Sequence, residues 1–167
     1  GQEFLVARVS PEMPSEVEPQ PRQWVVVNDV SASRSKIDMQ AQQYILKRLI
    51  EEADDDDSLF LINLNTRPEL VSREFTPIRS DATRQVLQRT TASRLGATNL
   101  MAGMEAAAEV IKQHKVTNPH ILYLGDGVAT DGSKEVFEPV RAVPREATFI
   151  GIGVGKKVDS LFLQEAA

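Results

Sequence analysis

Short, continuous runs of apolar residues alternate along the chain with longer segments in which apolar residues recur every three or four positions. The continuous runs cover residues 24–27, 59–62, 121–124 and 148–152. Unbroken apolarity over about four to eight residues is typical of strands that are buried on both faces, as in parallel sheets. We therefore predict a buried strand in each run.

The segments between these runs have the periodicity of helices. Apolar side chains of the first segment form a stripe that we expect to pack on the sheet: Ile37, Ala41, Tyr44, Ile45 and Leu49. Ser35, followed three residues later by Asp38, matches the pattern that begins a helix. Further helices are predicted at residues 81–91, 99–114, 133–140 and 159–165.

Strands and helices in alternation predict right-handed crossovers, and therefore an α/β fold. We expect a doubly wound, mostly parallel sheet with helices on both faces. Residues 70–75 are predicted as an extra edge strand, and the acidic run 54–57 as a solvated loop between a helix and a strand. That run lacks the alternating ligands and the turn glycine of a calcium-binding loop.

The first residues of the chain have a different character. A single apolar stretch at residues 4–9 is followed by four prolines, at positions 11, 14, 19 and 21, which predicts a short strand and an extended linker. We divide the chain into this N-terminal part, residues 1–23, and one globular domain, residues 24–167.

The composition of the chain excludes several classes of function. The 167 residues include no cysteine, which excludes thiol chemistry, iron–sulfur clusters and cysteine-ligated zinc. The net charge is −5, and no cluster of basic residues is present, so we expect no binding of nucleic acid. A transmembrane helix needs about 20 apolar residues. The apolar runs are far shorter, and we expect no direct insertion into a membrane.

Oxygen-bearing side chains gather where ligands bind in open α/β sheets, just beyond the carboxyl ends of the strands. Asp29, Ser31 and Ser33 follow the first buried run, and Asp126 follows the third. Thr98 precedes the long alanine-rich helix, whose N-terminus also points outward. If the three loops converge, two carboxylates and three hydroxyls form a hard-oxygen site, suited to Mg²⁺, Mn²⁺ or Ca²⁺ rather than to zinc or copper. An open coordination position would accept a carboxylate from a partner.

This arrangement resembles the metal-ion-dependent adhesion site of von Willebrand factor type A domains, and the resemblance covers about residues 24–167. It implies that Ser31, Ser33 and Thr98 contact a metal, with Asp29 and Asp126 bound directly or through water. It also implies a non-enzymatic module, in extracytoplasmic or cell-surface proteins, that binds an exposed Asp or Glu of a protein ligand through Mg²⁺, or through Mn²⁺ or Ca²⁺. The N-terminal part most resembles the inter-alpha-trypsin inhibitor heavy-chain branch, in which a VIT module precedes the domain.

The sequence departs from the family pattern in several places. Ala32 stands where glycine is usual, Gly125 where threonine is usual, and Arg34 where methionine is frequent. Arg34 adds a cation that competes with the metal or attracts an acidic partner. The family usually has one more strand and a final helix, which we expect this chain to lack. The strand at 148–154 should then be a sheet edge. An exposed edge of this kind permits self-association, unless the segment 4–9 covers it.

Three other readings are compatible with parts of this pattern. The aspartates and hydroxyls of the site also suit turns and helix caps. A magnesium-dependent phosphatase with Asp29 as nucleophile would need a second acid two residues later, where Ser31 stands. A metal-free interaction domain, in which Arg34 disables the site, is the third reading.

Overall fold

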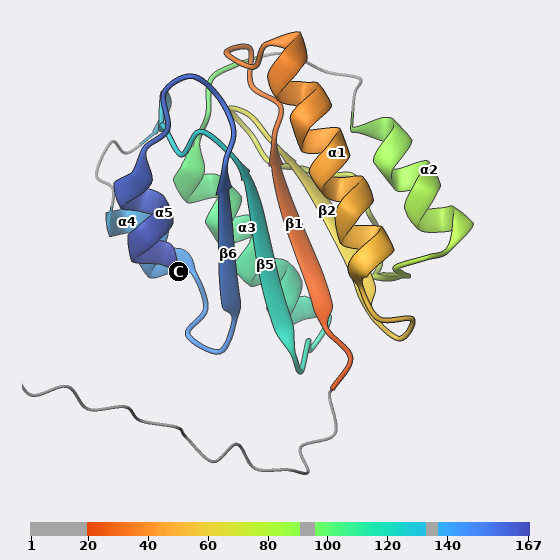
Figure 1. Ribbon diagram of the computed structural model, residues 1–167. Coiled ribbons are helices and arrows are strands. Elements are labelled where there is room, and N and C mark those ends of the chain that lie inside the picture. Colours follow the sequence, from red (N-terminus) through yellow and green to blue (C-terminus); the bar gives the residue numbers. More distant parts are fainter. Residues whose placement is uncertain (1–19, 91–95, 133–136) are drawn as a thin grey trace, which may run out of the picture.

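The computed structural model describes residues 20–90, 96–132 and 137–167 (Figure 1). The strands are β1 (Gln23–Asp29), β2 (Ser58–Leu64), β3 (Glu69–Leu70), β4 (Thr76–Pro77), β5 (Pro119–Gly125) and β6 (Thr148–Gly153). The helices are α1 (Lys36–Glu52), α2 (Asp81–Arg89), α3 (Leu100–Gln113), α4 (Phe137–Ala142) and α5 (Ser160–Ala166).

The strands form one sheet in the order β3-β2-β1-β5-β6, with β4 also paired to β2. The pairs β1–β2, β1–β5 and β5–β6 are parallel, while the short strands β3 and β4 run antiparallel to β2. The predicted doubly wound, mostly parallel sheet is confirmed. Because the central strands are parallel, their carboxyl ends meet at one edge, which is the upper edge in Figure 1.

Helices cover both faces of the sheet, and each face has its own apolar core. The side chains of β1 alternate between the faces: Trp24 and Val26 belong to the core under α1 and α2, and Val25 and Val27 to the core on the α3 side. Figure 1 shows α1 and α2 in front of the sheet and α3 behind it. Phe162 of α5 is fully buried in the core on the α3 side. Burial on both faces explains the continuous apolar runs.

Helix α1 begins where the sequence predicts, because Ser35 and Asp38 form a capping box. The predicted apolar stripe is wrong at two positions, since Ile37 is 75% exposed and Tyr44 is 66% exposed. The buried face includes a polar residue instead, Gln42. Its side-chain amide donates to the carbonyl oxygens of Asp29 at 2.9 Å and Leu124 at 3.0 Å. These bonds hold α1 against the ends of β1 and β5.

The single edge strand predicted at residues 70–75 is also wrong. Two separate two-residue strands, β3 and β4, pair with β2 instead. The pairing is interrupted because the hydroxyl of buried Ser72 accepts the hydrogen bond of the Leu61 amide at 3.0 Å. A side chain thereby replaces a backbone acceptor, which periodicity does not reveal.

The sequence predicts a solvated loop at residues 54–57, and this prediction is wrong at Asp57. Asp57 is 1% exposed, and its carboxylate accepts hydrogen bonds from the backbone nitrogen of Arg22 at 2.7 Å and from Arg22 Nε at 2.9 Å. Trp24 Nε1 donates to it at 3.1 Å. Asp57 therefore ties the loop after α1 to the start of β1, at the amino end of the sheet.

Strand β6 lies at one end of the sheet order, and no strand pairs with its outer side in the described part of the chain. The strand predicted at residues 4–9 lies outside the described residues, as do residues 10–19 of the predicted linker and residues 133–136 of the predicted helix. No helix among the residues described has both the length and the apolarity to span a membrane.

Candidate functional site

The first loop of the site follows β1. Asp29 is fully buried, and its Oδ1 accepts a hydrogen bond from the backbone nitrogen of Ser31 at 2.9 Å. This turn brings the Ser31 and Ser33 hydroxyl oxygens to 2.9 Å from each other. The alternation of the three residues in the sequence therefore has a structural reason, because the turn directs every second side chain to one point.

The second loop places Thr98 just before α3. The Thr98 hydroxyl lies 3.4 Å from Asp29 Oδ2. The loop is held by Thr130, which the sequence does not identify: its hydroxyl accepts the hydrogen bond of the Thr98 nitrogen at 2.8 Å, and its own nitrogen donates to the Thr98 oxygen at 3.0 Å. Thr98 is buried at this point, beside the Asp29 carboxylate.

Asp126 supplies the third loop, directly after β5. Its Oδ1 accepts a hydrogen bond from the Val128 nitrogen at 3.0 Å, which leaves Oδ2 to face the other loops. Oδ2 is joined to Ser33 through the guanidinium of Arg34. The structure thus brings together all the side chains predicted from the sequence, which we call the five-oxygen site: Asp29, Ser31, Ser33, Thr98 and Asp126.

Arg34 lies inside this cluster rather than on its rim. The residue is 5% exposed, and its Nη2 contacts Asp126 Oδ2 and donates to Ser33 Oγ at 3.2 Å. Nη1 donates to the carbonyl oxygen of Val154 at 2.5 Å. Nε lies 4.0 Å from Asp29 Oδ2, and it is buried without a hydrogen-bond partner among the residues that the structure describes. Of the two roles that the sequence leaves open for Arg34, this position favours competition with a metal.

Burial is the largest influence on the pKa of Asp29. It raises the pKa of the Asp29 carboxyl, while hydrogen bonds from Ser31 and the charge of Arg34 act in the opposite direction. Burial, together with the charge of Asp29, also raises the pKa of the Tyr123 hydroxyl. Tyr123 Oη accepts a hydrogen bond from the Gly127 nitrogen at 3.1 Å, so it braces the loop that carries Asp126.

Tyr123 also accounts for one departure from the family pattern. A Cβ at Gly125 would meet Tyr123 Oη and would lie 2.7 Å from Asp29 Cβ. Threonine does not fit there, and glycine is required by close approach rather than by backbone strain. The sequence offers a weak signal for this, namely a tyrosine two residues before an unexpected glycine.

One oxygen–oxygen distance in the site and the chemistry of its donors fit a small divalent cation. Adjacent oxygens around octahedral Mg²⁺ lie about 2.9 Å apart, given metal–oxygen distances of about 2.0–2.1 Å. The Ser31 and Ser33 hydroxyls are separated by 2.9 Å. Within the described ranges, no group of three or more His, Cys, Asp or Glu residues could hold a metal. A metal here would therefore depend on hydroxyl oxygens with two carboxylates, a set that suits hard cations.

The fold is shared with several solved structures of low sequence identity. A von Willebrand factor type A protein from Catenulispora acidiphila superposes with a TM-score of 0.74 at 15% identity, over 88% of this chain and 36% of that one. Manganese-loaded TRAP protein from Plasmodium vivax gives 0.70 at 17% identity, over 89% and 62%. Proximal thread matrix protein 1 from the mussel byssus, with a zinc-occupied adhesion-site motif, gives 0.72 at 17% identity, over 88% and 39%.

This chain thus spans less than two thirds of each of these three proteins, and the likeness extends to the fold. A comparison with curated proteins gave no match. The sequence profile of the von Willebrand factor type A domain matches residues 22–167, which include all three loops of the five-oxygen site. The chain therefore belongs to the von Willebrand factor type A domain family.

Proposed function

We propose that this chain is a protein-binding module that engages an acidic residue of its partner through a divalent cation held at the five-oxygen site. One observation carries the proposal: three loops, far apart in the sequence, bring five oxygen-bearing side chains together at the carboxyl ends of β1 and β5. Ser31, Ser33 and Thr98 would hold the ion, with Asp29 and Asp126 bound directly or through water.

A bound divalent ion would supply a Lewis acid for a carboxylate oxygen of the partner. The residues of this chain favour that role because three of the five donors are neutral hydroxyls. Two carboxylates neutralise the charge of the ion without exceeding it, so an open coordination position on the ion would remain able to accept a carboxylate oxygen. We propose Mg²⁺ as the resident ion, with Mn²⁺ or Ca²⁺ as alternatives. A similar structure with zinc in its adhesion-site motif and another that is manganese-loaded support a divalent ion in general.

The positions of the histidines support binding rather than catalysis. His120 lies near the amino end of β5, and His114 ends α3 near the same end of the sheet. The hydroxyls of Ser31 and Ser33 are at the opposite end. An imidazole base is therefore too distant to activate a serine nucleophile.

A second candidate function, metal-free protein binding, is favoured by a specific observation. The Arg34 guanidinium already supplies a cation between Asp126 and Ser33. A domain stabilised in this way would need no divalent ion to keep its loops together. Calorimetry separates the two functions, because only the first requires a metal.

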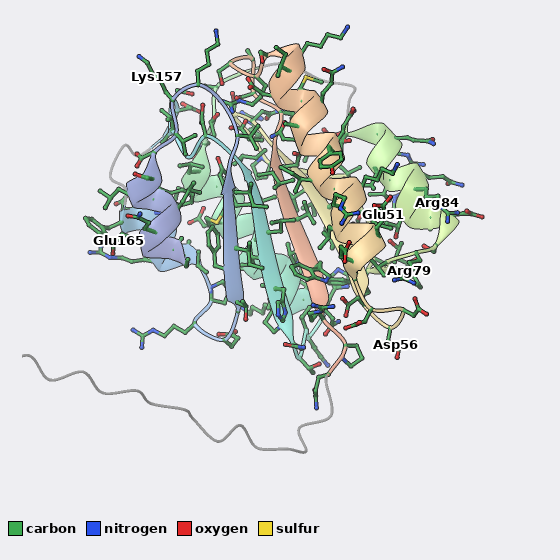
Figure 2. All side chains as sticks on the ribbon, in the orientation of Figure 1. Glu51, Asp56, Arg79, Arg84, Lys157 and Glu165 are labelled. Carbon is green, nitrogen blue, oxygen red and sulfur yellow. The ribbon has the colours of Figure 1, made fainter. Side chains whose placement is uncertain are left out.

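The first test is titration of the purified chain with Mn²⁺ and Mg²⁺ by calorimetry. Saturable binding at one site per chain is expected for the wild type, with a loss of about tenfold or more in affinity for Asp126→Ala. Asp56→Ala is the matched control, since Asp56 lies at the opposite end of the sheet (Figure 2). Absence of saturable binding by the wild type would reject the metal-dependent function.

The second test concerns the partner's carboxylate. Water bound to a Mn²⁺ ion at an open coordination position enhances the relaxation of bulk water protons. A peptide with an exposed glutamate should lower that enhancement, and the same peptide with glutamine should not. Equal effects of the two peptides would show that the site does not select a carboxylate.

A further inference from the structure

Arg34 is the most unusual residue of the site, because arginine is rarely buried unless it is fully paired. Its guanidinium lies among the oxygens that the proposed function assigns to a metal. We propose that Arg34 is a built-in cation that holds the five-oxygen site in its metal-free state, competes with the divalent ion and leaves the site when the ion binds. This inference rests on the proposed function.

The structure provides a receptor for the guanidinium on the far side of the site. The carbonyl oxygen of Val154, at the end of β6, accepts a hydrogen bond from Arg34 Nη1 at 2.5 Å. The next residue, Gly155, has φ +133°, and a Cβ there would lie 3.0 Å from Nη1. The loop between β6 and α5 therefore leaves room for Arg34 and supplies an acceptor for it.

The guanidinium and a divalent ion would need the same atoms. Arg34 Nη2 contacts Asp126 Oδ2 and Ser33 Oγ, and its Nε faces Asp29 Oδ2 at 4.0 Å. Ser33 Oγ is also hydrogen-bonded to Ser31 Oγ. Each of these oxygens belongs to the five-oxygen site, so the two cations exclude one another by geometry.

Charge makes the exclusion stronger. Two carboxylates and one guanidinium leave the cluster with a single negative charge, whereas a divalent ion added beside Arg34 would make it positive. Like charges at short range in a buried site repel strongly. A metal therefore binds most favourably when Arg34 has moved away.

Arg34 is held by bonds that allow such a movement. Within the described part of the chain its Nε has no hydrogen-bond partner, so the described residues satisfy the guanidinium incompletely. The neighbouring residues Ala32, Ser33 and Ser35 are exposed. A change in the rotamers of the long side chain therefore moves the guanidinium to solvent without unfolding α1.

Calorimetric titration with Mn²⁺ tests the competition by comparing the wild type with Arg34→Met, which keeps most of the apolar stem and removes the charge. We expect Mn²⁺ affinity to rise about tenfold or more, because a charge-assisted hydrogen bond no longer has to be broken. The melting temperature without metal should fall, and Mn²⁺ should raise it further than in the wild type. Arg84→Met is the control, because Arg84 is an exposed arginine of α2 (Figure 2).

Failure of the inference is distinguishable from failure of the proposed function. Equal Mn²⁺ affinities of the wild type and Arg34→Met would overturn the competition and leave metal binding intact. If neither protein binds Mn²⁺, both proposals fall. If binding appears only in Arg34→Met, the inference is supported, and the wild type functions without a metal.

A measurement on the wild type avoids any dependence on how the variant folds. The buried Nε–H of Arg34 should give a slowly exchanging signal in ¹⁵N-resolved NMR of the metal-free protein. Saturating Mg²⁺ should move that signal to the position and exchange rate of a solvated arginine. An unchanged signal at saturation would overturn the inference.

Discussion

Clusters of arginine and aspartate lie at both ends of the sheet, and they differ in how completely they are bonded. The Arg22 cluster, at the amino end, consists of Arg22, Trp24, Asp54 and Asp57. The Arg34 cluster, at the carboxyl end, consists of Arg34, Asp29, Ser33 and Asp126. Figure 2 labels Asp56, beside the first cluster, and Lys157, in the loop after β6, at opposite ends of the molecule.

In the Arg22 cluster both oxygens of the buried Asp57 carboxylate accept hydrogen bonds, from Arg22, Trp24 and the backbone. In the Arg34 cluster, Arg34 Nε has no hydrogen-bond partner among the described residues. Each carboxylate accepts a backbone hydrogen bond, from Ser31 or Val128, and the Thr98 hydroxyl also lies beside Asp29. The same two residue types therefore form a fully bonded ion pair at one end and, in our proposal, a site that can exchange its cation at the other.

The largest effect on stability is expected at the Arg22 cluster. Asp57→Ala removes the acceptor of Trp24 Nε1 and of the Arg22 backbone, and breaking a buried pair should lower the free energy of unfolding by about 3 kcal/mol. Urea denaturation measures this loss, and Mn²⁺ affinity should remain unchanged. Asp55→Ala, at an exposed neighbour paired with Arg79, is the control and should change neither quantity measurably. A large loss of Mn²⁺ affinity in Asp57→Ala would show that the two ends are coupled.

The largest effect on metal binding is expected at Asp29. Asp29→Asn keeps the size of the side chain and an oxygen for the Ser31 amide, but removes a negative charge from the five-oxygen site. Mn²⁺ affinity should fall by about a hundredfold. Calorimetry measures the affinity, and thermal melting without metal serves as the control for folding. A folded variant with wild-type affinity would contradict the role of Asp29.

Gly155→Ala tests the receptor of Arg34. Glycine is favoured at φ +133°, and the added Cβ would lie 3.0 Å from Arg34 Nη1. The strain should lower the free energy of unfolding by about 1–2 kcal/mol. Because the added Cβ should displace the Arg34 guanidinium, Mn²⁺ affinity should rise at the same time. A fall in both stability and affinity would indicate that the loop supports the metal directly.

The smallest effects distinguish two serines that are neighbours in the sequence. Ser33→Ala removes a hydroxyl of the five-oxygen site, and Ser35→Ala removes the cap of α1. Each change should lower the free energy of unfolding by about 1 kcal/mol. Only Ser33→Ala should also weaken Mn²⁺ binding, so denaturation and calorimetry together separate a ligand from a cap. Equal Mn²⁺ affinities of the two variants would show that Ser33 is not a metal ligand.

Much of the fold could be predicted because its signals are local. The continuous apolar runs identify β1, β2, β5 and β6, and their order with the helices defines the doubly wound sheet. Errors arose where a side chain makes a hydrogen bond that the local pattern does not reveal. Ser72 accepts from the backbone of β2, and the buried Gln42 of α1 donates to the backbone of β1. The placement of the chain in the inter-alpha-trypsin inhibitor heavy-chain branch depends on residues 1–23, and it stays a prediction.

The five residues of the site could be selected from the sequence because each follows a predicted strand or precedes a predicted helix. Their convergence depends on parallel pairing, which brings the ends of β1 and β5 together. The supporting residues Thr130, Tyr123 and Gly155 could not be selected in this way. Thr130 and Gly155 act across loops that are distant in the sequence and have no local signal, whereas Tyr123 has only the weak signal of the unexpected glycine two residues later.

By itself, the sequence determined which side chains are available at the site, since strand ends and helix starts are encoded by neighbouring residues. Only the tertiary structure decided where the guanidinium of Arg34 lies. The sequence places Arg34 beside the five-oxygen site, and both an exposed and a buried guanidinium are compatible with that position. The acceptor at Val154 and the space at Gly155, more than a hundred residues away, hold it inside. Long-range packing sets this outcome because burying a charge is favourable only where distant partners are already in place.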